Sequence, residues 1–350
     1  MPALTDTNAT ILVTGGSGFL GAWIVAKLLQ RGYSVRAAVR TEAKGRHLLN
    51  VNERHGARLQ IFAVGDISKS GAFDEAVRGV DGIVAAASPA ALEAEEPKEL
   101  IETAVNGATG MLKSVLKNGS SVKRIVFTSS FTTVLSYVDR PVTVDEDWWN
   151  DGCIRDCEVN GRKAQQMSKY AASKTLAEKA IWAFYEEHKA RVNWDITVLN
   201  PPLIFGPVLH EVTGVDSLNS SSKYLYEALV EGKFLGGNPL TFPGRGWIDV
   251  RDAADAHVKS LETPAAGGER IIISTEAFVW QDLRTSDFLL DAANSLSPKP
   301  YHTVAKGISG ERVRNITMDT RKARRILGLQ YRTVEEMVKD TFADYVRRGW

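Results

Sequence analysis

The chain has 350 residues, of which 44% are apolar and 24% charged, an ordinary composition for a soluble globular protein. Its formal net charge of +1 gives no electrostatic sign of nucleic-acid binding. Residues 1–10 are polar and the apolar runs are strand-length, so we expect no signal peptide, no membrane span and a cytoplasmic protein.

Two cysteines, Cys153 and Cys157, are too few for a disulfide framework and fit a reducing compartment. Their spacing would place them one turn apart on a helix. Because no histidine lies nearby to complete a ligand set, we expect no metal site.

The first half of the chain alternates short apolar runs with helical patterns. This succession predicts parallel strands joined by right-handed crossovers, and the continuous apolar strands predict a sheet covered on both faces. We expect strands at 11–13, 34–39, 58–64, 83–87, 122–127 and 195–199, and helices at 19–28, 42–54, 71–78, 97–118 and 168–189. Residues 139–165 predict a loop with short elements, and 270–273 are a candidate for a last strand of the sheet.

The first predicted strand runs directly into a turn rich in glycine. Gly15 permits a tight turn, Gly18 lets the backbone approach a pyrophosphate, and Gly21 lets the next helix pack closely. The phosphates would then meet the free N–H groups of that helix N-terminus. Glycine turns also occur for structural reasons alone, but this position at the start of a βαβ unit predicts dinucleotide binding. The expected contacts come from Gly15, Ser17, Gly18, Phe19, Leu20 and Gly21.

These features predict an α/β fold with a Rossmann-type doubly wound parallel sheet over residues 1–200 and segments returning near 248–276. Beyond residue 201, Gly, Ser and Pro accumulate and the alternation of strands and helices breaks down. We therefore expect a smaller C-terminal substrate-binding α/β domain over 201–247 and 277–350.

The second predicted strand ends in Arg40, where NAD sites usually carry an acidic residue that binds the ribose hydroxyls. A guanidinium can instead bind a 2′-phosphate through charge-assisted hydrogen bonds, and Lys44 would add a second cation. Both side chains can also be read as solvated surface charges, and Glu42 lies close by. We favour NADPH/NADP+ as the cofactor over NADH.

Tyr170 and Lys174 are four residues apart within a predicted helix, so their side chains share one face. A neighbouring cation stabilises a phenolate, and the tyrosine can then give a proton to a carbonyl oxygen as hydride reaches the carbon. A second such pair, Tyr185 and Lys189, lies roughly 22 Å further along the same helix. Small residues flank Tyr170 whereas charged ones follow Tyr185, so we take the first pair as functional.

A third polar group is expected where the fifth strand ends, because ligands bind at the carboxyl ends of such strands. That strand ends in Thr128-Ser129-Ser130. A serine hydroxyl there can bind a substrate carbonyl and share its developing negative charge, although such hydroxyls can also merely cap a strand end.

Together these motifs resemble the extended short-chain dehydrogenase/reductase superfamily over nearly the whole chain. The resemblance is strongest to the branch of dihydroflavonol reductases and fungal carbonyl and methylglyoxal reductases. It is carried by residues 13–21, 39–40, 65–67, 87–89, 127–130, 170–174, 200–201, 205–207 and 248–252. The run Val84-Ala85-Ala86-Ala87 lacks a histidine that the plant enzymes tend to have, which favours a fungal-type reductase of general carbonyl substrates.

The resemblance implies reduction of a small-molecule ketone or aldehyde, with Ser130, Tyr170 and Lys174 as the catalytic residues and Lys174 also binding the nicotinamide ribose. A monomer and a homodimer both fit. The resemblance further implies adenine contacts from Asp66 and Ile67, groove contacts from Ala87 and Thr128, nicotinamide contacts from Pro201 and Leu203, and a substrate-facing Phe131. Asn106 falls where the family often has an asparagine on its long helix.

Three other functions use the same scaffold. A nucleotide-sugar epimerase or dehydratase would retain NAD tightly and carry an acidic residue in place of Arg40. A hydroxysteroid-type dehydrogenase would oxidise with NAD. A non-catalytic NADP-sensing regulator would keep the glycine turn but lose the tyrosine–lysine pair, which this chain retains.

Overall fold

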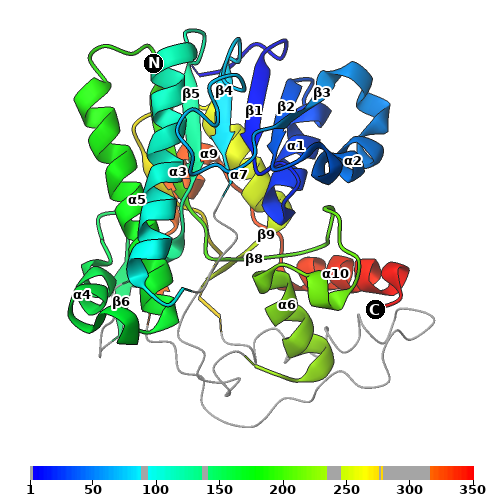
Figure 1. Ribbon diagram of the computed structural model, residues 1–350. Coiled ribbons are helices and arrows are strands. Elements are labelled where there is room, and N and C mark those ends of the chain that lie inside the picture. The colour runs from blue at the N-terminus through cyan, green and yellow to red at the C-terminus, as the bar shows by residue number, and fades with distance from the viewer. Residues whose placement is uncertain (1–2, 88–93, 136–140, 235–245, 276, 279–315) are drawn as a thin grey trace.

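The computed structural model describes residues 3–87, 94–135, 141–234, 246–275, 277–278 and 316–350 (Figure 1). A seven-stranded sheet lies at the centre, in the order β10-β7-β5-β4-β1-β2-β3, and every pairing in it is parallel. Its strands are β1 (Thr10–Thr14), β2 (Ser34–Val39), β3 (Leu59–Ala63), β4 (Gly82–Ala85), β5 (Arg124–Thr128), β7 (Asp195–Asn200) and β10 (Arg270–Ile272). The predicted parallel sheet is confirmed, including the return of the chain at β10.

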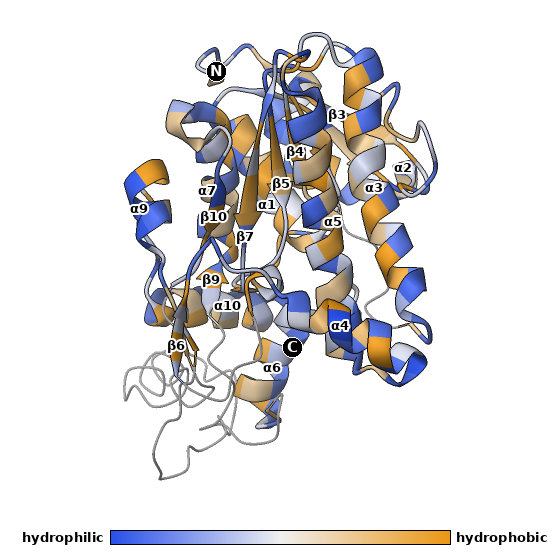
Figure 2. Ribbon diagram, turned by 90° about the vertical axis from the view of Figure 1, so that its left-hand side faces the viewer, coloured by the Kyte–Doolittle hydropathy of each residue, from blue (hydrophilic) through white to orange (hydrophobic). Residues whose placement is uncertain are grey.

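Helices cover both faces of the sheet, as a doubly wound fold requires. One face packs against α1 (Phe19–Gln30), α2 (Glu42–Val51), α7 (Val250–Glu262) and α9 (Arg321–Leu327). The other packs against α3 (Pro97–Asn118) and α5 (Gln166–His188), which run side by side in Figure 1. Figure 2 shows apolar residues concentrated in the central strands. Along α3 it shows both apolar and hydrophilic residues, as expected for a helix with one face on a core. The core therefore lies between the sheet and its helices.

Smaller elements gather below the carboxyl ends of the strands (Figure 1). They include two parallel two-stranded sheets, β6 (Val142–Val144) with β11 (Ile316–Met318) and β8 (Leu203–Phe205) with β9 (Trp247–Asp249). The helices here are α4 (Asp151–Asn160), α6 (Ser220–Tyr226) and α10 (Val334–Arg348). Short 3-10 or π turns are η1 (Glu53–Arg58), η2 (Phe131–Thr133), η3 (Gly161–Lys163), η4 (Val215–Ser217), η5 (Glu227–Glu231) and η6 (Pro264–Ala266).

A second apolar core joins α6 and α10 to β8 and β9, through residues such as Phe205, Leu225, Trp247 and Phe342. The helix α9, although it belongs to the stretch predicted as substrate domain, packs instead on the core of the main sheet. The division of the chain at residue 201 therefore stays a prediction, with α9 an exception to it.

The expected helix at 71–78 is wrong, because this stretch forms consecutive turns. Two glycines with positive φ, Gly71 (76°) and Gly79 (66°), bracket it and take the backbone out of the right-handed helical region at both ends. Asp74, in its middle, binds Ser114 and Lys117 of α3. These side-chain bonds hold the segment against α3, in addition to its own backbone turns and the burial of Phe73 and Val77.

The polar stretch 139–165 contains a ten-residue helix, α4, in addition to short elements. The Asn150 side chain caps its first turn by accepting from the Cys153 backbone N–H at 3.2 Å. Cys153 and Cys157 are free cysteines, buried and one turn apart on α4. In the described ranges, no group of three or more His, Cys, Asp or Glu side chains is arranged to hold a metal ion.

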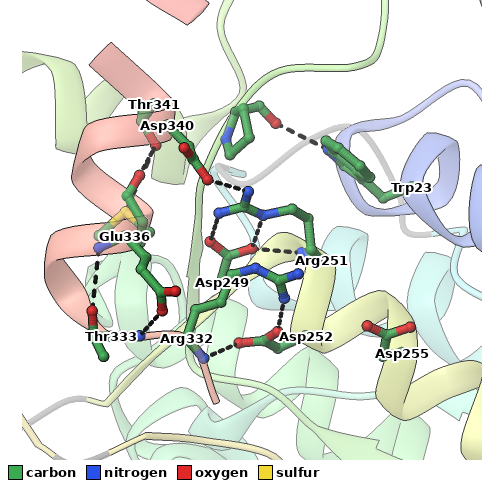
Figure 3. Close-up of polar contacts among 12 residues, drawn as sticks. Trp23, Asp249, Arg251, Asp252, Asp255, Arg332, Thr333, Glu336, Asp340 and Thr341 are labelled. Atoms are coloured by element: carbon green, nitrogen blue, oxygen red, sulfur yellow. Dashed lines mark hydrogen bonds and ion pairs between the residues drawn. The ribbon is translucent and has the colours of Figure 1, made fainter. Parts of the chain in front are cut away.

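The motif at 248–252, at the end of β9 and the start of α7, makes polar contacts with α10 and with the residue Arg332 just before it, as Figure 3 shows. The Asp249 carboxylate caps α7 by accepting from the Arg251 backbone N–H at 2.8 Å, and it pairs with the Arg251 guanidinium. Arg251 also pairs with Asp340 of α10, and Asp252 pairs with Arg332. The motif therefore fixes α10 against α7.

Candidate active site

A cleft opens at the carboxyl ends of β1, β4 and β5, on the side covered by α3 and α5. The strand order reverses between β1 and β4, which is where ligands bind in open α/β sheets. The described lining includes Thr14, Ile67, Ala85, Ala87, Gly107, Thr128, Ser129, Lys174 and Glu178. The structure thus brings together residues predicted to bind the cofactor and one predicted to be catalytic.

The glycine turn between β1 and α1 is sterically required. Gly15 has φ of +66°, and a Cβ there would lie 2.9 Å from the Cα of Ala87. A Cβ on Gly21 would lie 2.1 Å from the Gly15 carbonyl oxygen, so α1 packs directly against the turn. Gly18 is exposed, and a Cβ there would meet only the Gly15 oxygen, at 3.3 Å. This turn, with the N–H groups of the first turn of α1 above it, fits a pyrophosphate.

Ala87 is tied to the same turn, because its backbone N–H donates to the Thr14 hydroxyl at 3.0 Å. Of the other residues expected at the turn, Ser17 and Leu20 are half-buried, whereas the Phe19 ring is buried. The Phe19 ring lies 5.5 Å from that of His210. Phe19 therefore offers its backbone rather than its side chain to a phosphate.

The predicted 2′-phosphate ligands are exposed. Arg40 directly follows β2, and Lys44 is on the first turn of α2. The Lys44 ammonium lies 3.8 Å from a carboxylate oxygen of Glu211, a loose surface contact of little energetic weight. Both cations are therefore accessible to an anion at the end of β2.

Asp66 lies just beyond the end of β3, next to the strand that leads to Arg40. Its carboxylate accepts from the Ser68 hydroxyl at 2.7 Å and from the Ser68 backbone N–H at 3.0 Å. These bonds, with the nearby charges of Lys69 and Arg40, hold the pKa of Asp66 below its usual range. The carboxylate is therefore ionised at neutral pH and can accept a hydrogen bond from a ligand.

Tyr170 and Lys174 lie one turn apart on α5, both half-buried. The Lys174 ammonium is 5.9 Å from the centroid of the Tyr170 ring, and Lys174 lines the cleft. The second pair lies elsewhere: the Tyr185 ring packs 5.8 Å from that of Trp194, and Lys189 pairs with Glu186 at 2.6 Å. Burial raises the pKa of Tyr185, which makes it a poorer acid.

The two serines after β5 have different partners. The Ser129 hydroxyl donates to the carboxylate of Glu178 on α5. The Ser130 hydroxyl accepts from the backbone N–H and the hydroxyl of Thr132, at 3.2 and 3.0 Å. Within the described part of the chain, Ser130 accepts hydrogen bonds but donates none, so its proton is available for a substrate oxygen.

Thr128, at the end of β5, lines the cleft, and its hydroxyl forms a hydrogen bond of 2.8 Å with Nε2 of His257. Pro201 is buried, its carbonyl accepting from the Phe131 backbone N–H at 2.8 Å, and Leu203 is half-buried on β8. Asn106 is exposed on α3.

The prediction that Phe131 faces the substrate does not fit its surroundings. The side chain is only 2% exposed and packs with Val134, Val144, Ile272 and Ile316. The short turn η2 directs it into this cluster between β10 and the small sheet of β6 and β11. The ring is part of this core cluster, and its contact with a substrate stays a prediction.

Sequence reasoning missed Glu178 and Arg270, a buried ion pair behind Ser129. The signal for Glu178 was its spacing, since it follows Tyr170 and Lys174 at the same interval on one helix face. Arg270 carried no such signal, because its partner is 92 residues away in the chain.

Comparison with known proteins found similar chains over nearly the whole length. A model of the NAD dependent epimerase/dehydratase family matches residues 11–274. The chain is 33% identical over 350 residues to the ketoreductase azaE of Aspergillus niger, covering 97% of this chain and 98% of that one. It is 31% identical over 352 residues to the NADPH-dependent methylglyoxal reductase GRE2 of Saccharomyces cerevisiae, again covering 97% and 98%.

Among solved structures, yeast methylglyoxal/isovaleraldehyde reductase Gre2 complexed with NADPH resembles this chain with a TM-score of 0.79. The two chains are 29% identical, and the match covers 97% of this chain and 98% of the other. None of the helices in the described ranges has the length and apolarity that crossing a bilayer demands.

Proposed function

Since the chain belongs to the NAD-dependent epimerase/dehydratase family, we propose that it is an NADPH-dependent reductase of ketones or aldehydes. The observation that carries this is the position of Lys174, beside the Tyr170 ring and on the wall of the cleft. The relatives named as a ketoreductase and a methylglyoxal reductase support the same reaction class.

The cofactor would be held along the ends of β1 to β4. The N–H groups above the glycine turn would bind the pyrophosphate, and Arg40 with Lys44 would bind the 2′-phosphate. Asp66 and Ile67 would contact the adenine, and Ala87, Thr128, Pro201 and Leu203 the nicotinamide half. NADPH, when bound, supplies the hydride.

The protein would supply the proton and the electrostatic stabilisation. The Ser130 hydroxyl would donate a hydrogen bond to the substrate oxygen and share the charge that develops on it. The Tyr170 hydroxyl would transfer its proton to that oxygen. The ammonium of Lys174 would stabilise the phenolate that remains until solvent returns a proton.

The experiment is a panel of ketones and aldehydes with NADPH deuterated at either face of C4. We expect net consumption of NADPH, measured by the loss of its near-ultraviolet absorbance. Deuterium should appear on the carbinol carbon of the product with one of the two labelled cofactors and not with the other. An epimerase would return the hydride to its product and consume no NADPH, and a regulator would bind NADPH without turnover. Either result would contradict the proposal.

A further inference from the structure

A buried ion pair lies directly behind the two serines. It joins Glu178 of α5, whose side chain is 0% exposed, to Arg270 of β10, which is 8% exposed. One Glu178 oxygen accepts from Arg270 Nε. The other accepts from three donors: the Ser129 hydroxyl, the Thr133 hydroxyl at 2.9 Å and the Asn200 amide at 2.8 Å. Buried charges persist only when paired and fully hydrogen-bonded, and Glu178 meets both conditions.

Arg270 has partners of its own besides Glu178. Its guanidinium donates to the carbonyls of Glu146 and Trp148, at 2.7 and 2.6 Å, and to the Thr133 hydroxyl at 2.9 Å. It also stacks 3.8 Å from the centroid of the Trp149 ring. Arginine cannot be deprotonated in proteins, so it would stay a cation even without Glu178.

The network around Glu178 reaches the Ser130 backbone. The Asn200 amide, which has two N–H groups, donates to Glu178 and lies 3.3 Å from the Ser130 carbonyl oxygen. The Thr133 hydroxyl, which has one proton to donate, lies 2.9 Å from both the Glu178 carboxylate and that carbonyl. Glu178 therefore connects the segment after β5 to the end of β7 and to α5. Because α5 also carries Tyr170 and Lys174, this connection sets the distance between Ser130 and that pair.

The network also balances charge in the cleft. Tyr170, Lys174 and Glu178 follow one another at intervals of four on a single face of α5, and Lys174 and Glu178 both line the cleft. A lone carboxylate at this spacing would oppose the field of Lys174 at the phenol. Arg270 supplies the opposite charge, so the Glu178–Arg270 pair is neutral towards the cleft.

The other elements around Glu178 add little charge, within the described ranges. The α3 wall of the cleft consists of Ala104, Gly107, Ala108 and Met111. From α4, Asp151 pairs with Lys179 at the surface, at 2.5 Å. Near Arg270, the Glu146 carboxylate accepts from the Ile272 backbone N–H. From α9, Lys322 donates to the Arg270 carbonyl at 3.2 Å and is itself paired with Glu269 at 3.0 Å. Behind β5 lies His257, buried and uncharged.

We propose that Glu178, neutralised by Arg270, is a positioning residue for carbonyl reduction that fixes Ser130 against α5. Because the pair is neutral, Lys174 remains the charge that sets the electrostatic potential at the Tyr170 hydroxyl. The inference rests on the proposed function. It adds a second requirement for activity, outside the groups that touch the substrate.

The test compares Glu178→Gln with the double variant Glu178→Gln/Arg270→Met. The single variant leaves the Arg270 guanidinium as an unbalanced cation beside residue 178, which lies about 12 Å along α5 from Tyr170. That charge favours the phenolate, so we expect the alkaline limb of the pH–rate profile for reduction to move down by up to about one pH unit. In the double variant the alkaline limb should return to its wild-type position. In both variants we expect kcat to stay below the wild-type value and the NADPH KM to stay within about twofold of the wild-type value.

Thr133→Val is the matched neutral control, because it removes a hydroxyl that links Glu178 to Ser130 and changes no charge. We expect a lower kcat, an unchanged NADPH KM and an unmoved alkaline limb. This control also tests the positioning role if Glu178→Gln does not fold, which circular dichroism would reveal.

An alkaline limb that stays in place in Glu178→Gln, or that stays displaced in the double variant, would overturn the charge-balancing role. Wild-type kcat in Thr133→Val would overturn the positioning role. Failure of the proposed function is a separate result, because it would appear as wild-type protein that consumes no NADPH with any carbonyl compound.

Discussion

The hydroxyl of Thr128, at the carboxyl end of β5, donates to Nε2 of His257 on α7 over 2.8 Å. The direction follows from the other ring nitrogen: Nδ1 lies 2.7 Å from the Ala253 carbonyl oxygen, which can only accept. Nδ1 therefore carries the proton and Nε2 accepts. The bond fixes a neutral imidazole behind the strand that ends at Ser129 and Ser130.

This neutral histidine predicts loss of stability in acid. Burial lowers the pKa of His257 to about 4 from the ordinary value of 6.5. Since the folded pKa lies below the unfolded one, the stabilising contribution is complete above pH 6.5 and is lost as the pH falls towards 4. We expect the free energy of unfolding, measured with urea, to fall across this window less steeply in His257→Gln than in wild type. Burial also lowers the pKa of His210 to about 4, so His210 adds the same pH dependence of stability to the wild type and to the variant. Equal slopes would contradict the assignment.

Arg40→Ala should weaken NADPH selectively. Loss of a charge-assisted bond to the 2′-phosphate costs about 1.5–3 kcal/mol, so we expect the NADPH KM to rise roughly 10- to 100-fold and the NADH KM to change little. Steady-state kinetics with both cofactors measures this. Glu211→Gln is the matched comparison, because it removes the carboxylate that faces Lys44 and should slightly lower the NADPH KM. Equal effects of Arg40→Ala on the two cofactors would show that Arg40 is only a surface charge.

Two glycine substitutions should have opposite effects. Gly21→Ala places a Cβ 2.1 Å from the Gly15 carbonyl oxygen, so we expect lower thermal stability and loss of NADPH binding in a fluorescence titration. Gly110→Ala, on α3, meets no atom within 4 Å and should stabilise the protein by up to ~1 kcal/mol through helix propensity. Normal NADPH binding by Gly21→Ala would contradict the argument that the turn requires glycine at this position for steric reasons.

The parallel strands and most long helices follow from the sequence because their signals are local. Continuous apolar runs predicted β1, β2, β5 and β7, and the glycine cluster predicted the turn before α1. The turns at 71–79 escaped prediction because an eight-residue apolar pattern does not reveal the flanking positive φ of Gly71 and Gly79. The helix α4 escaped because its residues are mostly polar and its beginning depends on one cap, Asn150.

The site was predictable to the extent that its residues lie in short motifs. The tyrosine–lysine spacing and the serines after β5 were visible, since each motif lies on one element. The burial of Phe131 was not, because it depends on Ile272 and Ile316, which arrive from distant parts of the chain. The spacing of Glu178 after Lys174 placed it on the same helix face, but its burial depends on Arg270, and a charged residue in a sequence gives no sign that tertiary contacts will bury it.

The central claim is that Tyr170, and not Tyr185, donates the proton during carbonyl reduction. Single-turnover reduction by Tyr170→Phe and Tyr185→Phe, each first shown to bind NADPH, tests it most directly. We expect the first variant to lose roughly 10²- to 10⁴-fold in rate and the second to stay close to wild type. A near-normal rate in Tyr170→Phe with NADPH bound would contradict the account.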